Sequence, residues 1–87
     1  RAEVLLHSDL ATAKRQIFAT LGTLEEVNGG VLLHSQTDDL NWLARELARL
    51  PFAFEIREPK ELGGAVRRHA RALAAAADAT ISRRQRS

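Results

Sequence analysis

Short apolar runs alternate with amphipathic stretches along this chain, and their order predicts a small α+β domain. Three stretches with apolar residues three and four positions apart are typical of helices, at about residues 10–21, 40–50 and from about 60 onwards. Four segments with the apolar, alternating character of β-strands lie at residues 2–7, 23–27, 31–35 and 52–57. The predicted order is therefore strand, helix, strand, strand, helix, strand and one further helix.

An internal repeat indicates how the predicted strands are arranged. The first strand contains Val-Leu-Leu-His-Ser at residues 4–8, and the third strand contains the same five residues at 31–35. Each copy leads through a polar cap into a helix, which indicates one strand-to-helix unit used twice. Right-handed crossovers would place these two strands side by side and, we expect, parallel at the centre of the sheet. The sequence thus predicts a ferredoxin-like βαββαβ sandwich with an additional C-terminal helix.

Local signals give the expected ends of these elements. Asn28-Gly29-Gly30 is typical of a tight hairpin turn, so the second and third strands should be antiparallel neighbours. The adjacent Glu25 and Glu26 favour an edge position for the second strand. The remaining signals are helix boundaries: a cap at Ser8 or Asp9, a stop at Gly22, a cap at Asp38 or Asp39, a stop at Pro51, and a weak or late start of the last helix at Gly63-Gly64.

Side-chain alternation along the two repeated strands predicts an exposed contact surface. If Val4, Leu6, Val31 and Leu33 face the helices, the intervening residues must face the other way. We therefore expect four side chains at the middle of the open sheet face, namely Leu5, His7, Leu32 and His34. An apolar patch on a small domain usually marks a contact surface, which a second copy, a neighbouring domain or the last helix would cover.

Trp42 is expected in the first turn of the second helix, away from the leucine stripe formed by residues 40, 43, 47 and 50. This position indicates a flank of the core or a domain contact, because tryptophan often anchors interfaces. We therefore add Trp42 to the predicted interface residues. The three phenylalanines, by contrast, are predicted to lie in the core: Phe18, Phe52 and Phe54.

Composition and charge limit the classes of partner. The chain of 87 residues has a net charge of +2, but three arginines lie in its last five residues. Without them ten basic residues face eleven acidic ones, so residues 1–82 form a nearly neutral single domain and residues 83–87 a basic, disordered tail. The absence of cysteine leaves no disulfide framework. No stretch is predicted to span or bind a membrane, so we expect a cytoplasmic protein. The first residue, Arg1, indicates a piece of a longer chain.

The sequence contains no convincing set of residues for catalysis, for a metal ion or for a cofactor. His7 and His34 lie on adjacent predicted strands, but two imidazoles without a third ligand make a poor metal site. Ser8 and Ser35 each follow a histidine, and neighbours on a strand point to opposite faces. The central strands also lack the aromatic rings with which such sheets stack nucleic-acid bases. We therefore predict a protein that is not an enzyme, without metal or cofactor.

The run Asp39-Leu40-Asn41-Trp42-Leu43-Ala44-Arg45-Glu46-Leu47 and the segments around it resemble a known family, the C-terminal extension (WCX) domain of bacterial WYL-domain transcriptional regulators. The resemblance runs from Glu3 to about Ala76, and that run is its most specific part. A strand and Glu58-Pro59-Lys60-Glu61-Leu62 follow it. The opening strand from Glu3 and the hairpin at residues 27–31 are similar as well.

The resemblance implies a ferredoxin-like regulatory module that helps pair subunits and couples the WYL sensor to a winged helix-turn-helix domain. The chain has no tyrosine, so the WYL domain itself is elsewhere in the parent protein, and DNA would be bound only by its N-terminal domain. We expect a homodimer formed through the open sheet face. The alternative is a small-molecule-binding regulatory domain of ACT-like type, with an effector held at a strand edge or between paired sheets.

Overall fold

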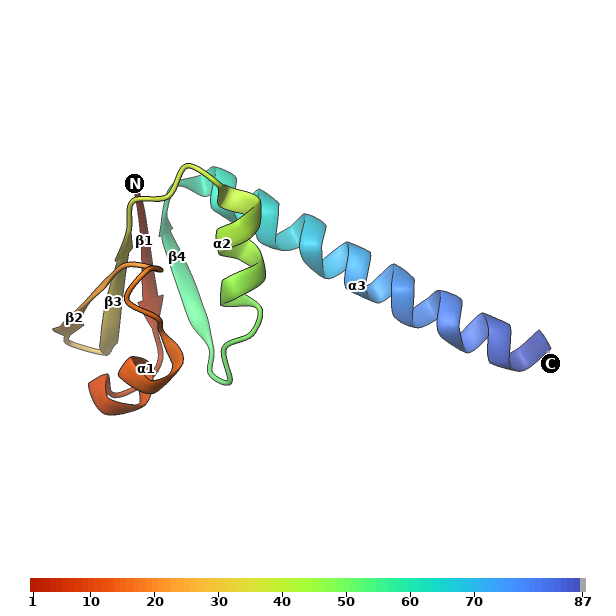
Figure 1. The fold of residues 1–87 in the computed structure, drawn as a ribbon, viewed down its shortest axis with the longest axis horizontal. Coiled ribbons are helices and arrows are strands. Elements are labelled where there is room, and N and C mark those ends of the chain that lie inside the picture. Colours follow the sequence, from red (N-terminus) through yellow and green to blue (C-terminus); the bar gives the residue numbers. More distant parts are fainter. Residues whose placement is uncertain (87) are drawn as a thin grey trace.

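A computed structural model describes the backbone of residues 1–86 and the side chains of residues 1–80. Its α+β architecture confirms the predicted order of elements (Figure 1). The elements, in chain order, are β1 (Ala2–Leu6), α1 (Leu10–Gln16), β2 (Thr23–Val27), β3 (Gly30–Ser35), α2 (Leu40–Leu47), β4 (Phe54–Glu58) and α3 (Lys60–Arg86). Both internal helices are shorter than the apolar spacing predicted. Strand β4 also begins two residues later than predicted.

The four strands form one antiparallel sheet in the order β2-β3-β1-β4. The repeated strands β1 and β3 are its central pair, as predicted, but the expected parallel pairing was wrong. The reason is topological. A crossover through α1 returns β2 parallel to β1, and the β2–β3 hairpin then reverses the chain once. The predicted edge position of β2 is confirmed.

The β2–β3 hairpin closes at the predicted place, with Val27 opposite Gly30. Within the two-residue turn, Gly29 adopts a left-handed φ of 89°, whereas Asn28 does not have a positive φ. Gly30 has a second constraint, because a Cβ atom there would collide with the carbonyl oxygen of Leu6 on the neighbouring strand β1. The turn and the close approach of two strands therefore both depend on glycine.

The core lies on one face of the sheet, where alternate residues of β1 and β3 meet the helices. Val4, Leu6, Val31 and Leu33 are completely buried, which confirms the predicted inward set. They pack in one buried cluster with residues of all three helices, namely Ala13, Leu43, Ala44, Leu47, Leu62 and Ala65. The helices therefore cover the same face, and the opposite face of the sheet carries no helix within the described chain (Figure 1).

One predicted core residue is not in the core. Phe18 follows the C-terminal end of α1, and its side chain is 67% exposed. Helix α1 ends at Gln16, and its C-cap residue Ile17 already has an extended backbone. The chain therefore leaves helical periodicity one residue before Phe18, and that side chain turns to solvent. Phe52 and Phe54 are half-buried against the core.

Asp9 and Asp39 cap the two internal helices, which resolves both alternatives that the sequence left open. The carboxylate of Asp9 accepts a hydrogen bond from the backbone N–H of Thr12 at 2.7 Å, and that of Asp39 accepts one from Trp42 N–H at 2.9 Å. The hydrogen bonds from Thr12 stabilise the ionised carboxylate and lower the pKa of Asp9 below its ordinary value of 3.8.

We expect Asp39→Ala to destabilise the fold by about 1 kcal/mol, because α2 loses the side-chain acceptor at its first turn. Asp38→Ala is the matched control, since Asp38 is the neighbouring carboxylate that does not cap the helix. It should leave the free energy of unfolding within about 0.5 kcal/mol of the original value. Urea unfolding followed by circular dichroism measures both, and equal losses in the two variants would contradict the assignment.

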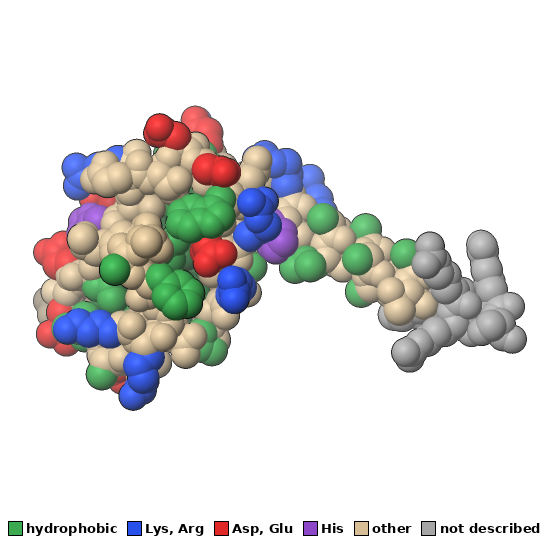
Figure 2. Space-filling model, viewed as in Figure 1, with side chains coloured by type: hydrophobic (Ala, Val, Ile, Leu, Met, Phe, Trp, Pro, Cys, Tyr) green, Lys and Arg blue, Asp and Glu red, His purple; other side chains and the backbone are tan. Residues whose placement is uncertain are grey.

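Helix α3 differs most from its predicted form. It runs unbroken from Lys60 through Gly63 and Gly64 to Arg86, so the glycine pair does not delay its start. Leu62 is buried and Val66 half-buried, but Leu73 is 56% exposed, contrary to the predicted inner stripe. The eight-residue helix α2 reaches only the first turns of α3, and the rest projects from the body (Figures 1 and 2). Residue 87 and the side chains of the predicted basic tail lie outside the described residues.

Candidate functional site

The predicted residues of the open sheet face do lie on that face, in an arrangement set by the antiparallel register. Leu5 and Leu32 are directly opposite each other at its centre. His34 lies opposite Glu3, whereas His7 lies at the other end of β1, beyond Leu6 and its partner Val31. The two imidazoles are thus separated along the sheet by the leucine pair. A parallel pairing of the two repeats in register would instead have placed them side by side.

Each histidine of the repeat contacts a glutamate on the adjoining edge strand. His7 Nε2 lies 3.0 Å from Glu55 Oε2 on β4, and His34 Nε2 lies 2.9 Å from Glu25 Oε1 on β2. The repeat relates β1 to β3 and therefore β4 to β2, so the two contacts are equivalent by its pseudo-two-fold symmetry. The internal repeat thus extends from the strands to their side-chain pairs.

The apolar part of this open face is smaller than the sequence indicated. Leu5 is only 5% exposed although it faces away from the helices. Leu32 is half-buried, while the side chains of His34 and His7 are 22% and 44% exposed. The face therefore presents a narrow apolar centre between polar groups, and its accessible part consists chiefly of Leu32 and the two imidazoles.

Carboxylates surround that apolar centre. Glu25 and Glu55 lie across the same row of the sheet as Leu32 and Leu5, and Glu3 lies in the next row. Glu3 also contacts a cation, with Arg1 Nη2 at 3.1 Å from its Oε1. The side chains of Glu25 and Glu55 are about 60% exposed. Among the described residues, Glu25 contacts the imidazole of His34, and Glu55 contacts that of His7. Glu58 of β4 lies opposite Glu3 and adds a further carboxylate at the end of this row.

The sequence does not mark these glutamates as members of the site. Glu25 was predicted only as a charge on an edge strand, and nothing local in the sequence connects Glu25 or Glu55 to a histidine. The nearest signal was the repeat itself, because a histidine at the same place in each copy predicts equivalent neighbours. Finding those neighbours required the register between strands, which the hydrophobic pattern does not give for the two edge strands.

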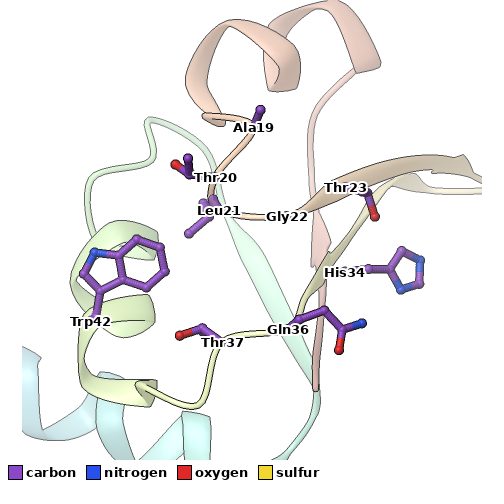
Figure 3. A pocket seen from close by; sticks show the side chains of 9 residues that line it. All are labelled: Ala19, Thr20, Leu21, Gly22, Thr23, His34, Gln36, Thr37 and Trp42. Atoms are coloured by element: carbon purple, nitrogen blue, oxygen red, sulfur yellow. The ribbon is translucent and has the colours of Figure 1, made fainter.

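Trp42 lies outside this face and borders a cavity of about 610 Å³. The indole is half-buried and packs against the core. The cavity lies where the connection from α1 to β2 meets the connection from β3 to α2 (Figure 3). Its wall comprises Ala19, Thr20, Leu21, Gly22, Thr23, His34, Gln36, Thr37 and Trp42. The prediction that grouped Trp42 with the open-face residues thus joined residues from two different surfaces.

The described residues contain neither a cluster of metal ligands nor a helix that could span a membrane. Among them, no three histidine, aspartate or glutamate side chains gather in a way that would hold a metal ion. Nor does any described helix combine the length and the apolar character that a passage through a lipid bilayer requires. The open face and the cavity at Trp42 are therefore the two candidate sites of the described structure.

Comparison with known families identifies the domain. The model of the WCX domain family matches residues 1–74, which include the whole sheet, α1, α2 and the packed part of α3. Neither the curated proteins nor the solved structures contain a match to the chain. The family match covers most of the sequence and ends where α3 leaves the body of the domain. The chain therefore belongs to the WCX domain family.

Proposed function

We propose that this domain is the C-terminal regulatory and oligomerisation domain of a bacterial WYL-type transcriptional regulator. In this proposal its role is not catalytic. It couples the assembly of subunits to effector sensing by a WYL domain of the same parent chain, and a winged helix-turn-helix domain binds DNA. The regulator acts in the cytoplasm. Membership of the WCX family is the observation that supports the proposal most directly.

We also propose that the fold is ferredoxin-like. The sheet order β4-β1-β3-β2, the antiparallel pairing throughout and a common helix-covered face support this assignment. Such a fold leaves one sheet face free of helices. In this domain that face contains the symmetric leucine and histidine residues, which makes it the natural position for a contact between subunits or domains.

The proposed contact is a homodimer formed through the open face. Leu32 and its neighbour Leu5 would supply the apolar centre, with His7 and His34 on either side. The pseudo-symmetric arrangement suits a two-fold contact, in which the same surface is used by both partners. The glutamates around the centre would oppose each other across such a contact, so association would be weak in the 87-residue chain alone.

Replacing Leu32 by aspartate tests this proposal. Leu32→Asp removes apolar burial and places a carboxylate at the centre of the contact, so we expect self-association to weaken by at least roughly tenfold. Sedimentation equilibrium over a wide concentration range measures the constant. Leu73→Asp is the matched control, because that leucine is exposed and belongs to α3, outside the sheet.

An original chain that stays monomeric at the highest concentration would refute the homodimer. Equal weakening in the two variants would show that the contact lies elsewhere. In the parent regulator, loss of assembly on Leu32→Asp would support the role of the face, and unchanged assembly would contradict it.

The cavity at Trp42 supports a second candidate function, a small-molecule-binding regulatory domain of ACT-like type. Its volume of about 610 Å³ lies within the range of roughly 300–1,000 Å³ that ligand sites occupy. The cavity adjoins Thr23, the first residue of edge strand β2. A thermal-shift screen with metabolites tests this function, because a specific ligand in large excess raises the melting temperature of the folded state.

A further inference from the structure

The cavity beside Trp42 is formed by a close approach between two connections. Gly22, just before β2, lies so near the carbonyl oxygen of His34 that a Cβ atom would collide with it. Leu21 is 5% exposed and anchors the same segment in the core. On the other side, Thr37 Oγ1 accepts a hydrogen bond of 3.0 Å from the N–H of Asp39, the cap of α2. Both walls are thus fixed by packing and hydrogen bonds.

The polar groups around the cavity are uncharged. Thr20 and Thr37 contribute two hydroxyls, and the nine lining residues include no arginine, lysine, aspartate or glutamate. The amide of Gln36 points away from Trp42 (Figure 3). His34 contributes to the rim, but its ring points away from Trp42 (Figure 3), toward the glutamates of the open face. A charged ligand would lose hydration here without gaining an opposite charge, whereas a neutral polar ligand could exchange hydrogen bonds with water.

Trp42 gives the cavity one flat apolar side. Its backbone N–H donates to Asp39, which fixes the first turn of α2 and the base of the side chain. One part of the indole packs on the core, and the rest borders the cavity near Thr20 and Thr37 (Figure 3). An aromatic face of this kind favours an offset-stacked ring, and the hydroxyl groups near it pair with polar atoms at the ring edge.

From this combination we propose that the Trp42 cavity binds an uncharged, flat heteroaromatic molecule, stacked on the indole and hydrogen-bonded by Thr20 and Thr37. A nucleoside base is an example of this class. This inference rests on the second candidate function, the binding of a small molecule at the same cavity, and is independent of the homodimer. If the nucleosides do not bind but the thermal-shift screen finds another ligand, only the present proposal fails.

The sequence provides a direct probe, since Trp42 is the sole tryptophan and the chain has no tyrosine. Tryptophan emission of the 87-residue chain therefore reports on this cavity alone. We would titrate it with inosine and cytidine as neutral flat probes, with ribose as the non-aromatic control and inosine monophosphate as the charged control. Titration to about 10 mM would largely fill even a site with a dissociation constant near 1 mM. We expect saturable quenching by the nucleosides and none by ribose.

The double variant Thr20→Val with Thr37→Val removes both hydroxyls and leaves Trp42 unchanged. It should bind the nucleosides about tenfold more weakly, the effect of losing two hydrogen bonds. Thr80→Val, far along α3, is the matched control and should bind as the original chain does. Circular dichroism confirms that each variant is folded.

Three results would overturn the proposal. The first is an emission that no flat probe changes. The second is equal affinity in the original chain and the double variant, which would place the ligand elsewhere. The third is tighter binding of the monophosphate than of inosine, which would contradict an uncharged site. Quenching is measured on the chain irrespective of its association state, so these results do not depend on the homodimer.

Discussion

Leu33→Ala is expected to remove about 2–5 kcal/mol of stability, a large fraction of the roughly 5–15 kcal/mol by which domains are stable. Leu33 is completely buried, on the central strand β3, where it lies opposite Val4 of β1 and Leu24 of β2. Truncation removes apolar contacts and leaves a cavity under the helices that the short α2 cannot easily fill. Urea unfolding monitored by circular dichroism measures the loss.

The adjacent Leu32→Ala is the matched control, because it makes the same chemical change one residue away on the other face. Leu32 is half-buried among polar neighbours rather than in the core, so its truncation should cost only about 1 kcal/mol. Similar losses at the two positions would contradict the assignment of faces. A larger loss at Leu32 than at Leu33 would reverse it.

The combined change Glu25→Gln and Glu55→Gln is expected to strengthen self-association through the open face by roughly five- to thirtyfold, the effect of removing two to four repulsions. A two-fold contact brings the carboxylates of two copies together, and each removed repulsion contributes roughly 0.5 kcal/mol. Glutamine keeps the size of the side chain and its ability to hydrogen-bond the neighbouring imidazole. Sedimentation equilibrium at about pH 8, above the range in which histidine usually changes charge, measures the effect.

The dependence of self-association on salt concentration is a second test of the same repulsion. Screening weakens repulsion between exposed carboxylates, so raising the salt concentration should strengthen association of the original chain and change the double variant little. Glu61→Gln is the control for a general charge effect, because Glu61 lies in the first turn of α3, outside the sheet. Weaker association of the double variant, or weaker association of the original chain in high salt, would contradict the expected repulsion, because the glutamates would then pair with cationic groups of the second copy.

Much of the fold follows from local sequence signals. The order of elements, the hairpin at residues 28–30 and the inward set of Val4, Leu6, Val31 and Leu33 were all predicted, since apolar periodicity and turn residues act over a few positions. The family resemblance was also confirmed, because it rests on a nearly continuous pattern of residues. The predicted ends of the helices were less accurate, because α1 ends before Phe18 and α3 continues through Gly63 and Gly64.

In the candidate site, the face on which each residue lies could be predicted from the sequence, but its neighbours on that face could not. Alternation along each strand placed Leu5, His7, Leu32 and His34 on one face, since that depends on one strand at a time. Which residues lie side by side on the face depends on strand direction and register. The antiparallel pairing separated the two histidines and brought each to a glutamate of an edge strand.

The order of the elements, the inward residues of the two central strands and the family thus follow from local signals, because each is encoded in residues that are close along the chain. Contacts between distant segments do not follow from such signals. The pairs of His7 with Glu55 and of His34 with Glu25, and the cavity between residues 19–23 and Trp42, required the chain to fold back on itself. These contacts are fixed by the packing and register of whole elements, which no local pattern specifies.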